Sequence, residues 1–148
     1  MTTYHTKPVI IADTSGLISL LIPTDHNHKP AKEAADRLIT TDTDILIPSA
    51  VFVEFLNILG RNVGHAAAAA AAAELQPPFL VLNEPIALHT GSAMKHFVQA
   101  PAAVSFTDCL VMALADEYGT REIFGFDKQF ADAGYHRLTP STQWEDAA

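Results

Sequence analysis

Four acidic residues stand where a folded sheet could bring their carboxylates together at one edge. Asp13 and Asp127 each follow a short apolar run of the kind that forms a buried strand. Glu54 and Asp108 each lie near the start of a stretch that reads as a helix. Carboxylates that converge without basic partners repel one another, so the folded cluster needs a compensating cation. Oxygen-only ligand sets favour Mg²⁺ or Mn²⁺, and we therefore predict a site for one of these ions.

Each acid also has a purely structural alternative. Asp13 could be a turn residue, and Asp127 could cap the short helix that follows it. Ser105 stands three residues before Asp108, so this pair could form a capping box. Glu54 could lie on an exposed stripe of its helix. A shared site accounts for all four positions at once, whereas these alternatives require four independent coincidences.

The elements that would position the acids alternate between strands and helices. Short apolar runs predict five strands, at 9–12, 44–47, 79–82, 123–126 and 135–138. The segments between and around them predict helices at 17–22, 31–39, 49–60, 65–75, 83 or 84 to 98, 105–119 and 127–133. This alternation predicts an α/β fold, a three-layer α/β/α sandwich around a central parallel sheet of about five strands. In such sheets, sites lie beyond the carboxyl ends of the strands, which is where the four acids are expected.

Composition limits the class of protein. The 148 residues predict one domain spanning 1–148, and the formal net charge is −8. A general polyanion binder would be basic, so a nucleic acid would have to be held by a local basic patch and by metal. The single cysteine, Cys109, allows no disulfide and fits a reducing compartment. The N-terminus lacks a signal-peptide pattern, and the longest apolar run, Ala66–Ala73, is far shorter than the ~20 residues of a membrane span. We expect a soluble, cytoplasmic protein without membrane contact.

Further polar residues are candidates for contacts with a substrate. Lys128 and Arg61 could bind phosphate, although both read equally well as ordinary surface charges. Ser15 and Thr107 could hold phosphate oxygens or metal-bound water. Asp132 could join the acidic site or merely face water.

An ordered set of motifs resembles the PIN-domain ribonucleases. It comprises Asp-Thr-Ser at 13–15, Ser-x₄-Glu at 49–54, Ser-x-x-Asp at 105–108 and Phe-Asp-Lys-x-Phe at 126–130. Within that family the chain looks most like the VapC-type toxins of toxin–antitoxin pairs. The resemblance extends from residue 9 to residue 138, and its specificity comes from the order of the motifs, since each motif is common by itself.

This resemblance implies a three-layer α/β/α fold and metal-dependent cleavage of RNA. It carries the catalytic and metal-binding roles onto Asp13, Glu54, Asp108 and Asp127, with Mg²⁺ or Mn²⁺ as the cofactor. The partners it implies are an RNA substrate, a small cognate antitoxin and a second copy of the chain in a homodimer. Two alternatives remain at this stage. One is a non-catalytic PIN-like interaction module, and the other is an RNA-processing or DNA nuclease outside a toxin–antitoxin pair.

Overall fold

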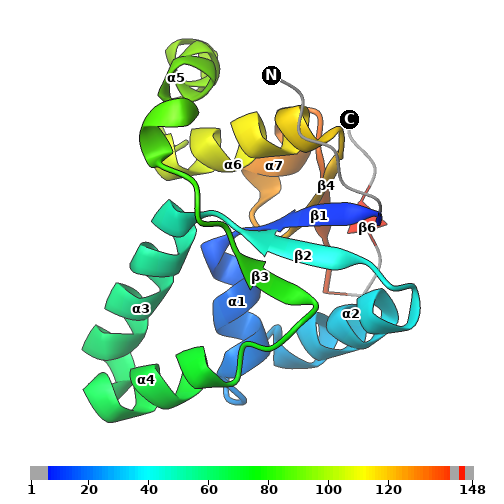
Figure 1. Ribbon diagram of the computed structural model, residues 1–148, viewed down its shortest axis with the longest axis vertical. Helices are drawn as coiled ribbons and strands as arrows, with labels where there is room; N and C mark the ends of the chain where they lie inside the picture. Colours follow the sequence, from blue (N-terminus) through cyan, green and yellow to red (C-terminus); the bar gives the residue numbers. More distant parts are fainter. Residues whose placement is uncertain (1–6, 141–143, 146–148) are drawn as a thin grey trace.

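A mixed sheet forms the centre of the protein. The computed structural model describes residues 7–140 and 144–145, and its strand order is β3-β2-β1-β4-β5-β6 (Figure 1). The first five strands in the chain pair in parallel, and β6 pairs antiparallel with β5. The bounds are β1 Val9–Ala12, β2 Asp44–Ile47, β3 Phe79–Val81, β4 Glu122–Phe124, β5 His136–Leu138 and β6 Trp144–Glu145. The predicted parallel sheet of five strands is confirmed.

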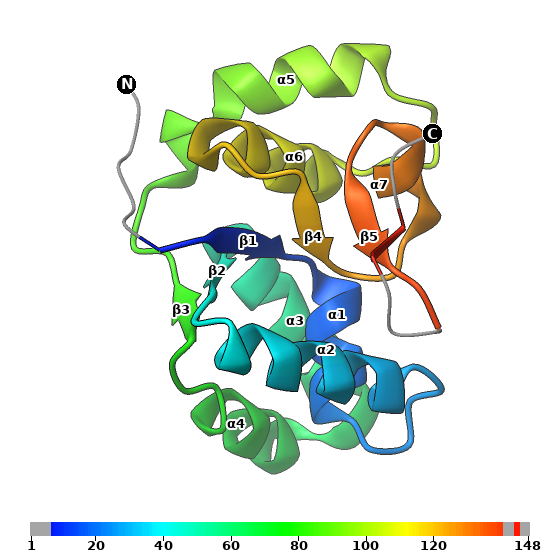
Figure 2. The same ribbon diagram turned by 90° about the vertical axis from the view of Figure 1, so that its right-hand side faces the viewer.

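Helices flank this sheet on both faces. They are α1 Thr14–Leu21, α2 His28–Thr40, α3 Ser49–Val63, α4 His65–Ala73, the 3₁₀-helix η1 Ile86–Leu88, α5 Thr90–Gln99, α6 Phe106–Tyr118 and α7 Lys128–Asp132. Helices α1 to α4 lie below the strands in the view of Figure 1, whereas α5 and α6 lie above them. The turned view of Figure 2 shows the same separation, which confirms the predicted α/β/α layering. Among the described residues, no helix is both long and apolar enough to cross a membrane.

The two central strands explain why the sheet is covered on both faces. All residues of β1 and β2 are buried, and Ile10 of β1 pairs in register with Ile45 of β2. A strand that buries both faces reads as a continuous apolar run, which is the pattern that predicted β1. Helix α1 packs closely against the end of β4 at Gly16. A Cβ atom at position 16 would lie 2.1 Å from the carbonyl oxygen of Phe124, so the contact requires a residue without a side chain.

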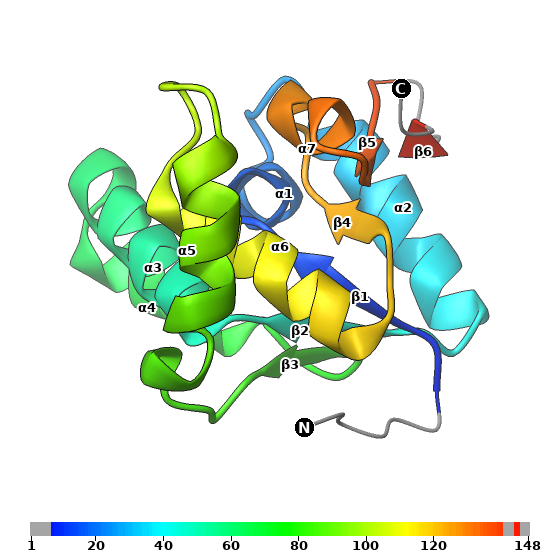
Figure 3. The same ribbon diagram turned by 90° about the horizontal axis from the view of Figure 1, so that it is seen from above.

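Helix α6 is the buried helix of the upper layer. Every residue from Asp108 to Ala115 is buried, which fits a helix that is apolar on nearly all sides. It contacts β1 beneath it and α5 outside it, and Figure 3 shows α5 and α6 side by side. The N-terminus of α6 is thereby fixed against the sheet, and that end carries Asp108.

Several element ends are shifted by one to three residues from their predicted positions, so that β4 ends at Phe124 and the predicted strand had run to Phe126. Two elements differ in kind. The helix expected to start at residue 83 or 84 is absent there, because Pro85 is extended, with φ −62° and ψ 135°, and the chain forms only η1 before α5 begins at Thr90. A proline also disfavours helical geometry in the residue before it, here Glu84. The two-residue strand β6 was not predicted, since so short a segment carries no periodic pattern.

Candidate metal centre

The strand order places two of the predicted acids side by side. The chain runs from β1 to β2 and β3 on one side, and β4 and β5 add on the other side of β1. Ala12 pairs with Phe124 at the carboxyl ends of β1 and β4, and the backbone N–H of Asp13 donates to the Phe124 carbonyl at 3.0 Å. This point, where the strand order reverses, is where α/β sheets bind ligands. Asp13 directly follows β1, and Asp127 lies in the loop after β4, so the two acids flank this point.

Asp13 is buried and held by its neighbours. Its side chain is the N-cap of α1, with Oδ2 accepting from the Ser15 backbone N–H at 3.3 Å and from the Ser15 hydroxyl at 3.0 Å. The Ser15 Oγ in turn accepts from the Phe126 N–H at 3.0 Å, which ties the loop after β4 to the start of α1. Gly125 lets this loop come close, since a Cβ there would lie 2.9 Å from the Asp13 Cβ. The capping alternative is therefore real but compatible with a role in the cluster.

Asp108 also combines a structural contact with the site. Its backbone N–H donates to Ser105 Oγ at 3.1 Å, and its Oδ2 accepts from the Ser105 N–H at 2.9 Å, which completes a capping box. The same Oδ2 accepts a hydrogen bond from Gln129 Nε2 at 2.9 Å. The carboxylate is thus fixed from two elements, α6 and α7, with the Oδ1 atom left for a ligand.

Three of the four predicted acids come together. One carboxylate oxygen from each of Asp13, Asp108 and Asp127 lies within 4.8 Å of the other two. Burial, with the nearby charges of Asp127 and Asp108, raises the pKa of Asp13 to about 8. Burial and the charge of Asp108 raise the pKa of Asp127 as well. The side chain of Asp127 makes no capping hydrogen bond to α7, so helix capping does not account for its position.

Glu54 lies at the margin of this cluster. It is half-buried on α3 and is not among the three acids whose oxygens converge. Its charge nevertheless contributes to the raised pKa of Asp127, after the larger effects of burial and of Asp108. The fourth acid therefore faces the site from α3 without joining its tightest part.

The four predicted substrate contacts fall in different environments. Ser15 is committed to positioning Asp13, and Thr107 is half-buried in the first turn of α6, next to Asp108. Lys128 is exposed at the start of α7, directly after Asp127. Arg61 is exposed in the last turn of α3, seven residues beyond Glu54, or roughly 10 Å along the helix at 1.5 Å per residue. Of these two cations, Lys128 is the better placed to contact a phosphate at the acidic cluster.

Sequence reasoning missed three residues that shape the site. Gln129 holds Asp108, Gly125 makes room for Asp13, and Arg137 donates to the Phe126 carbonyl at 2.8 Å. The positive charge of Arg137 also lowers the pKa of Asp127. Gln129 and Gly125 lie within two residues of Asp127, and this proximity was the available signal. Nothing in the sequence marked Arg137, because its place follows from strand pairing.

The donor set fits a hard divalent cation. The three converging groups are carboxylates, and the pKa values of Asp13 and Asp127 are raised by burial and then by repulsion between the acids, which a bound cation would relieve. Oxygen ligands favour Mg²⁺ and Mn²⁺ over softer metals. Asp13, Asp108 and Asp127 are therefore the residues that would hold such an ion.

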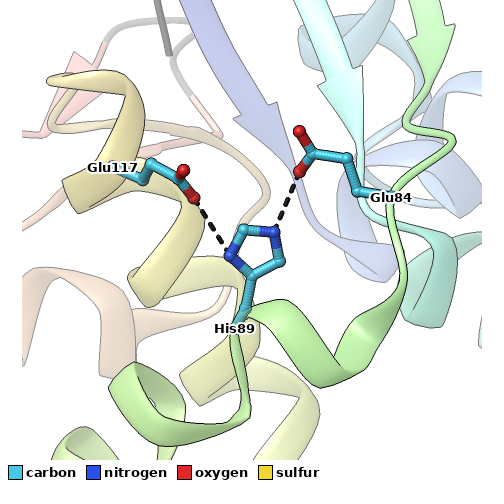
Figure 4. Close-up of side chains that lie close together, drawn as sticks. All are labelled: Glu84, His89 and Glu117. Atoms are coloured by element: carbon cyan, nitrogen blue, oxygen red, sulfur yellow. Dashed lines mark hydrogen bonds and ion pairs between the residues drawn. The ribbon is translucent and has the colours of Figure 1, made fainter. Parts of the chain in front are cut away.

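A second cluster was also missed, on the far side of α6 from α7. His89 is buried, and its Nε2 lies 2.9 Å from Glu84 Oε2 while its Nδ1 lies 3.0 Å from Glu117 Oε2 (Figure 4). A neutral imidazole has one N–H and can donate to only one carboxylate, whereas the imidazolium donates to both. Each ring nitrogen of His89 lies within hydrogen-bonding distance of a different carboxylate. This triad ties the segment before α5 to the C-terminal end of α6.

The comparisons with known proteins agree with this arrangement. The sequence profile of the PIN domain matches residues 10–134, so the chain belongs to the PIN-domain family. The structure is similar to that of VapC20 from Mycobacterium tuberculosis, described as a toxin that cleaves the sarcin–ricin loop. The TM-score is 0.70 and the identity 28%, over 85% of this chain and 95% of that chain. The predicted resemblance to VapC-type PIN domains is confirmed.

A more distant likeness supports the fold alone. The crystal structure of VapBC2 from Rickettsia felis shows that complex bound to a DNA fragment from its promoter. It matches with a TM-score of 0.60 and 10% identity, over 78% of this chain and 85% of that chain. The comparison with curated proteins finds no match.

Proposed function

We propose that this PIN-domain protein is a metal-dependent endoribonuclease and the toxin of a type II toxin–antitoxin pair. The observation that carries the proposal is the convergence of the Asp13, Asp108 and Asp127 carboxylates within 4.8 Å at the point where the strand order reverses. The PIN-domain match and the likeness to the RNA-cleaving toxin VapC20 support RNA as the substrate. The intact set of acids argues against a non-catalytic interaction module.

The residues around the cluster have distinct roles in this proposal. Asp13, Asp108 and Asp127 bind Mg²⁺ or Mn²⁺, and Glu54 adds negative charge from α3. Ser15 keeps Asp13 in place through a 3.0 Å hydrogen bond, and Gln129 keeps Asp108 in place through one of 2.9 Å. A divalent cation at such a site supplies a Lewis acid that lowers the pKa of a bound water and offsets charge on the phosphate.

Asp127 is the most solvent-accessible of the three converging acids, so it is the one best placed to contact a water molecule. It is half-buried and makes no capping hydrogen bond to α7, whereas Asp13 and Asp108 are buried. We assign to it the orientation of the attacking water. Lys128, the next residue, is exposed and supplies a positive charge for the RNA backbone. Thr107 and Arg61 are the more peripheral contacts of the same strand of RNA.

The partner of such a toxin is a small antitoxin that silences it. A protein with a net charge of −8 suits a basic partner segment. An arginine that reached the Asp13 and Asp127 carboxylates would replace the charge of the metal and block substrate. The RNA target and the antitoxin would both be met in the cytoplasm, where we place the protein.

We propose that residues 1–148 form a single nuclease domain. We also propose that two copies of the chain assemble into a homodimer. The apolar side chains exposed on η1 and α5 support this assembly: Ile86, Leu88, Met94, Phe97 and Val98 are each more than two-fifths exposed. Exposed apolar patches of this kind commonly mark protein interfaces. Light scattering coupled to size exclusion would give the mass in solution, and a monomer at all concentrations would refute the dimer.

The nuclease proposal is tested on a panel of RNAs. The purified protein is incubated with structured RNAs, including a sarcin–ricin loop hairpin, and with matched DNA and unstructured RNA. We expect cleavage of RNA but not of DNA in the presence of Mn²⁺ or Mg²⁺. Cleavage of DNA at a comparable rate would favour the alternative of a DNA nuclease, and no cleavage of any nucleic acid would favour an interaction module.

A further inference from the structure

A pocket opens beside the acidic cluster, between the C-terminal end of α5, the loop that precedes α6, and α7. Its volume is about 440 Å³, within the range of roughly 300 to 1,000 Å³ that is typical of small-ligand sites. The residues that define its chemistry are Gln99, Val104, Met112, Lys128, Gln129 and Asp132.

One side chain belongs both to the pocket and to the metal centre. Gln129 lines the pocket, and its Nε2 donates to Asp108 Oδ2 at 2.9 Å. Gln129 therefore connects the pocket directly to one acid of the cluster, Asp108. An RNA strand with its scissile phosphate at the cluster would bring a flanking nucleotide to this pocket.

The walls combine apolar and polar surface. Val104 and Met112 are buried residues that form part of the apolar side, together with the small side chains of Ala100 and Ala103. Exposed polar groups of Gln99, Lys128 and Asp132 surround that surface. A planar base with an apolar face and a hydrogen-bonding edge matches this combination, and proteins read unpaired RNA bases in this way.

The polar groups favour one kind of base. The Gln129 amide must turn its NH₂ group toward Asp108, because a carboxylate only accepts hydrogen bonds. Its Oε1 accepts no hydrogen bond within the described part of the chain, and neither does the Asp132 carboxylate, which stands one turn further along α7. The pocket therefore presents two acceptors on the same helix face. Guanine offers two adjacent donors on its Watson–Crick edge, N1–H and the N2 amine, whereas adenine and uracil offer one each.

We propose that this pocket binds an unpaired guanine that flanks the scissile phosphate. The Asp132 carboxylate accepts from the guanine N2 amine, the Gln129 Oε1 accepts from N1–H, and the base packs on Val104 and Met112. Lys128 neutralises the adjacent phosphate. This inference rests on the proposed function, because it names the feature of the RNA that this nuclease site selects.

The first test needs no cleavage. Guanosine 5′-monophosphate is titrated into the ¹⁵N-labelled protein. Inosine monophosphate, which lacks the N2 amine, and adenosine monophosphate, which lacks both the N1–H and the N2 amine, serve as comparison probes. We expect guanosine monophosphate to shift the resonances of Gln129, Asp132 and Gln99 most strongly. Shifts that are equal for the three nucleotides, or absent at the highest soluble concentration, would overturn the guanine pocket even if the protein cleaves RNA.

The second test uses a matched pair of variants. Asp132→Asn removes the negative charge and turns one of the two acceptor oxygens into an NH₂ donor that faces the donor edge of guanine. Asp36→Asn makes the same change on α2, where Asp36 is exposed and pairs with Lys32 at 3.6 Å. Loss of a paired base contact lowers discrimination roughly 10-fold. We therefore expect Asp132→Asn to lower kcat/KM about 10-fold for an oligonucleotide with guanine beside the cut, leaving an inosine substrate little changed. Asp36→Asn should alter neither substrate.

The outcomes of the two tests separate the two claims. Wild-type protein that cleaves RNA without preferring guanine, or that keeps its preference in Asp132→Asn, would refute the pocket and leave the nuclease intact. Wild-type protein that cleaves no RNA but binds guanosine monophosphate at Gln129 and Asp132 would refute the nuclease and support the pocket.

Discussion

Gly125 lies so close to Asp13 that a Cβ atom at position 125 would sit 2.9 Å from the Asp13 Cβ and 3.1 Å from Ser15 Oγ. Distances below 3.0 Å between such carbons essentially require one of them to move. Neither neighbour can easily give way, because Asp13 is buried and Ser15 is hydrogen-bonded to both Asp13 and Phe126. The absence of a side chain at 125 thus sets the position of Asp13, an acid of the proposed metal site.

We accordingly predict that Gly125→Ala weakens metal binding and cleavage. The substitution should displace Asp13 from the cluster and reduce Mn²⁺ affinity about 10-fold or more, in the range found when groups that orient metal ligands are removed. Isothermal titration with Mn²⁺ measures this. Gly91→Ala is the control, since a Cβ at that helical position meets nothing within 4 Å and should only stabilise the fold, by up to about 1 kcal/mol. Equal metal affinity in both variants would contradict the packing account.

A second prediction concerns charge repulsion in the metal-free protein. Asp108→Asn keeps the shape of the side chain and an oxygen that can accept from Ser105, but it replaces one of the three converging carboxyl groups with a neutral amide. We expect the melting temperature in EDTA to rise, with a gain in unfolding free energy on the order of 1 to 2 kcal/mol, about the value of one pKa unit. Added Mg²⁺ should stabilise the wild type by mass action and the variant much less. Equal metal-induced shifts would exclude Asp108 from the metal site.

The raised pKa of Asp13 predicts how metal-free stability depends on pH. With a pKa of about 8 in the folded protein and an ordinary value of 3.8 when unfolded, the folded state keeps its proton across that interval while the unfolded state loses it. The stabilisation is therefore complete at low pH and is lost as the pH rises toward 8. In EDTA, the unfolding free energy should fall between about pH 4 and about pH 8, and Asp13→Asn should flatten this slope. A wild-type slope identical to that of the variant would refute the assignment to Asp13.

The His89 triad should contribute to stability. His89→Ala removes the hydrogen-bonding partner that Glu84 and Glu117 share, and both acids are partly buried. A loss of about 2 kcal/mol is expected, between the values for exposed and fully buried pairs. Urea denaturation measures it, with His26→Ala on the exposed loop as a control that should change little. A loss no larger than that of the control would mean that the triad does not stabilise the fold.

The sequence predicted the parts of this structure that depend on local pattern. Buried strands such as β1 are continuous apolar runs, and acids that directly follow them must emerge at the carboxyl edge of a parallel sheet. This reasoning located Asp13 and Asp127 without knowledge of the strand order. The Ser-x-x-Asp motif that ends at Asp108 allowed two interpretations, a capping box and a site acid. The structure shows that the capping box and the acidic cluster use the same carboxylate.

The parts that could not be predicted depend on contacts between distant segments. The Gln129 hydrogen bond to Asp108 requires the packing of α7 against α6, and Arg137 reaches the loop before α7 only because β5 pairs with β4. The start of α5 was misplaced for a related reason. Glu84 and His89 are joined by a hydrogen bond outside any helix, and the helical propensity of the intervening residues does not reveal it.

The central claim is that the carboxylates of Asp13, Asp108 and Asp127 bind the metal that allows RNA to be cut. The most direct measurement compares wild-type protein with Asp13→Asn, purified in parallel, on one RNA substrate with Mn²⁺ and with EDTA. The account predicts cleavage by the wild type with Mn²⁺ and none in the other three reactions. Cleavage by the wild type that persists in EDTA while Asp13→Asn remains inactive, which excludes a contaminating nuclease, would contradict it.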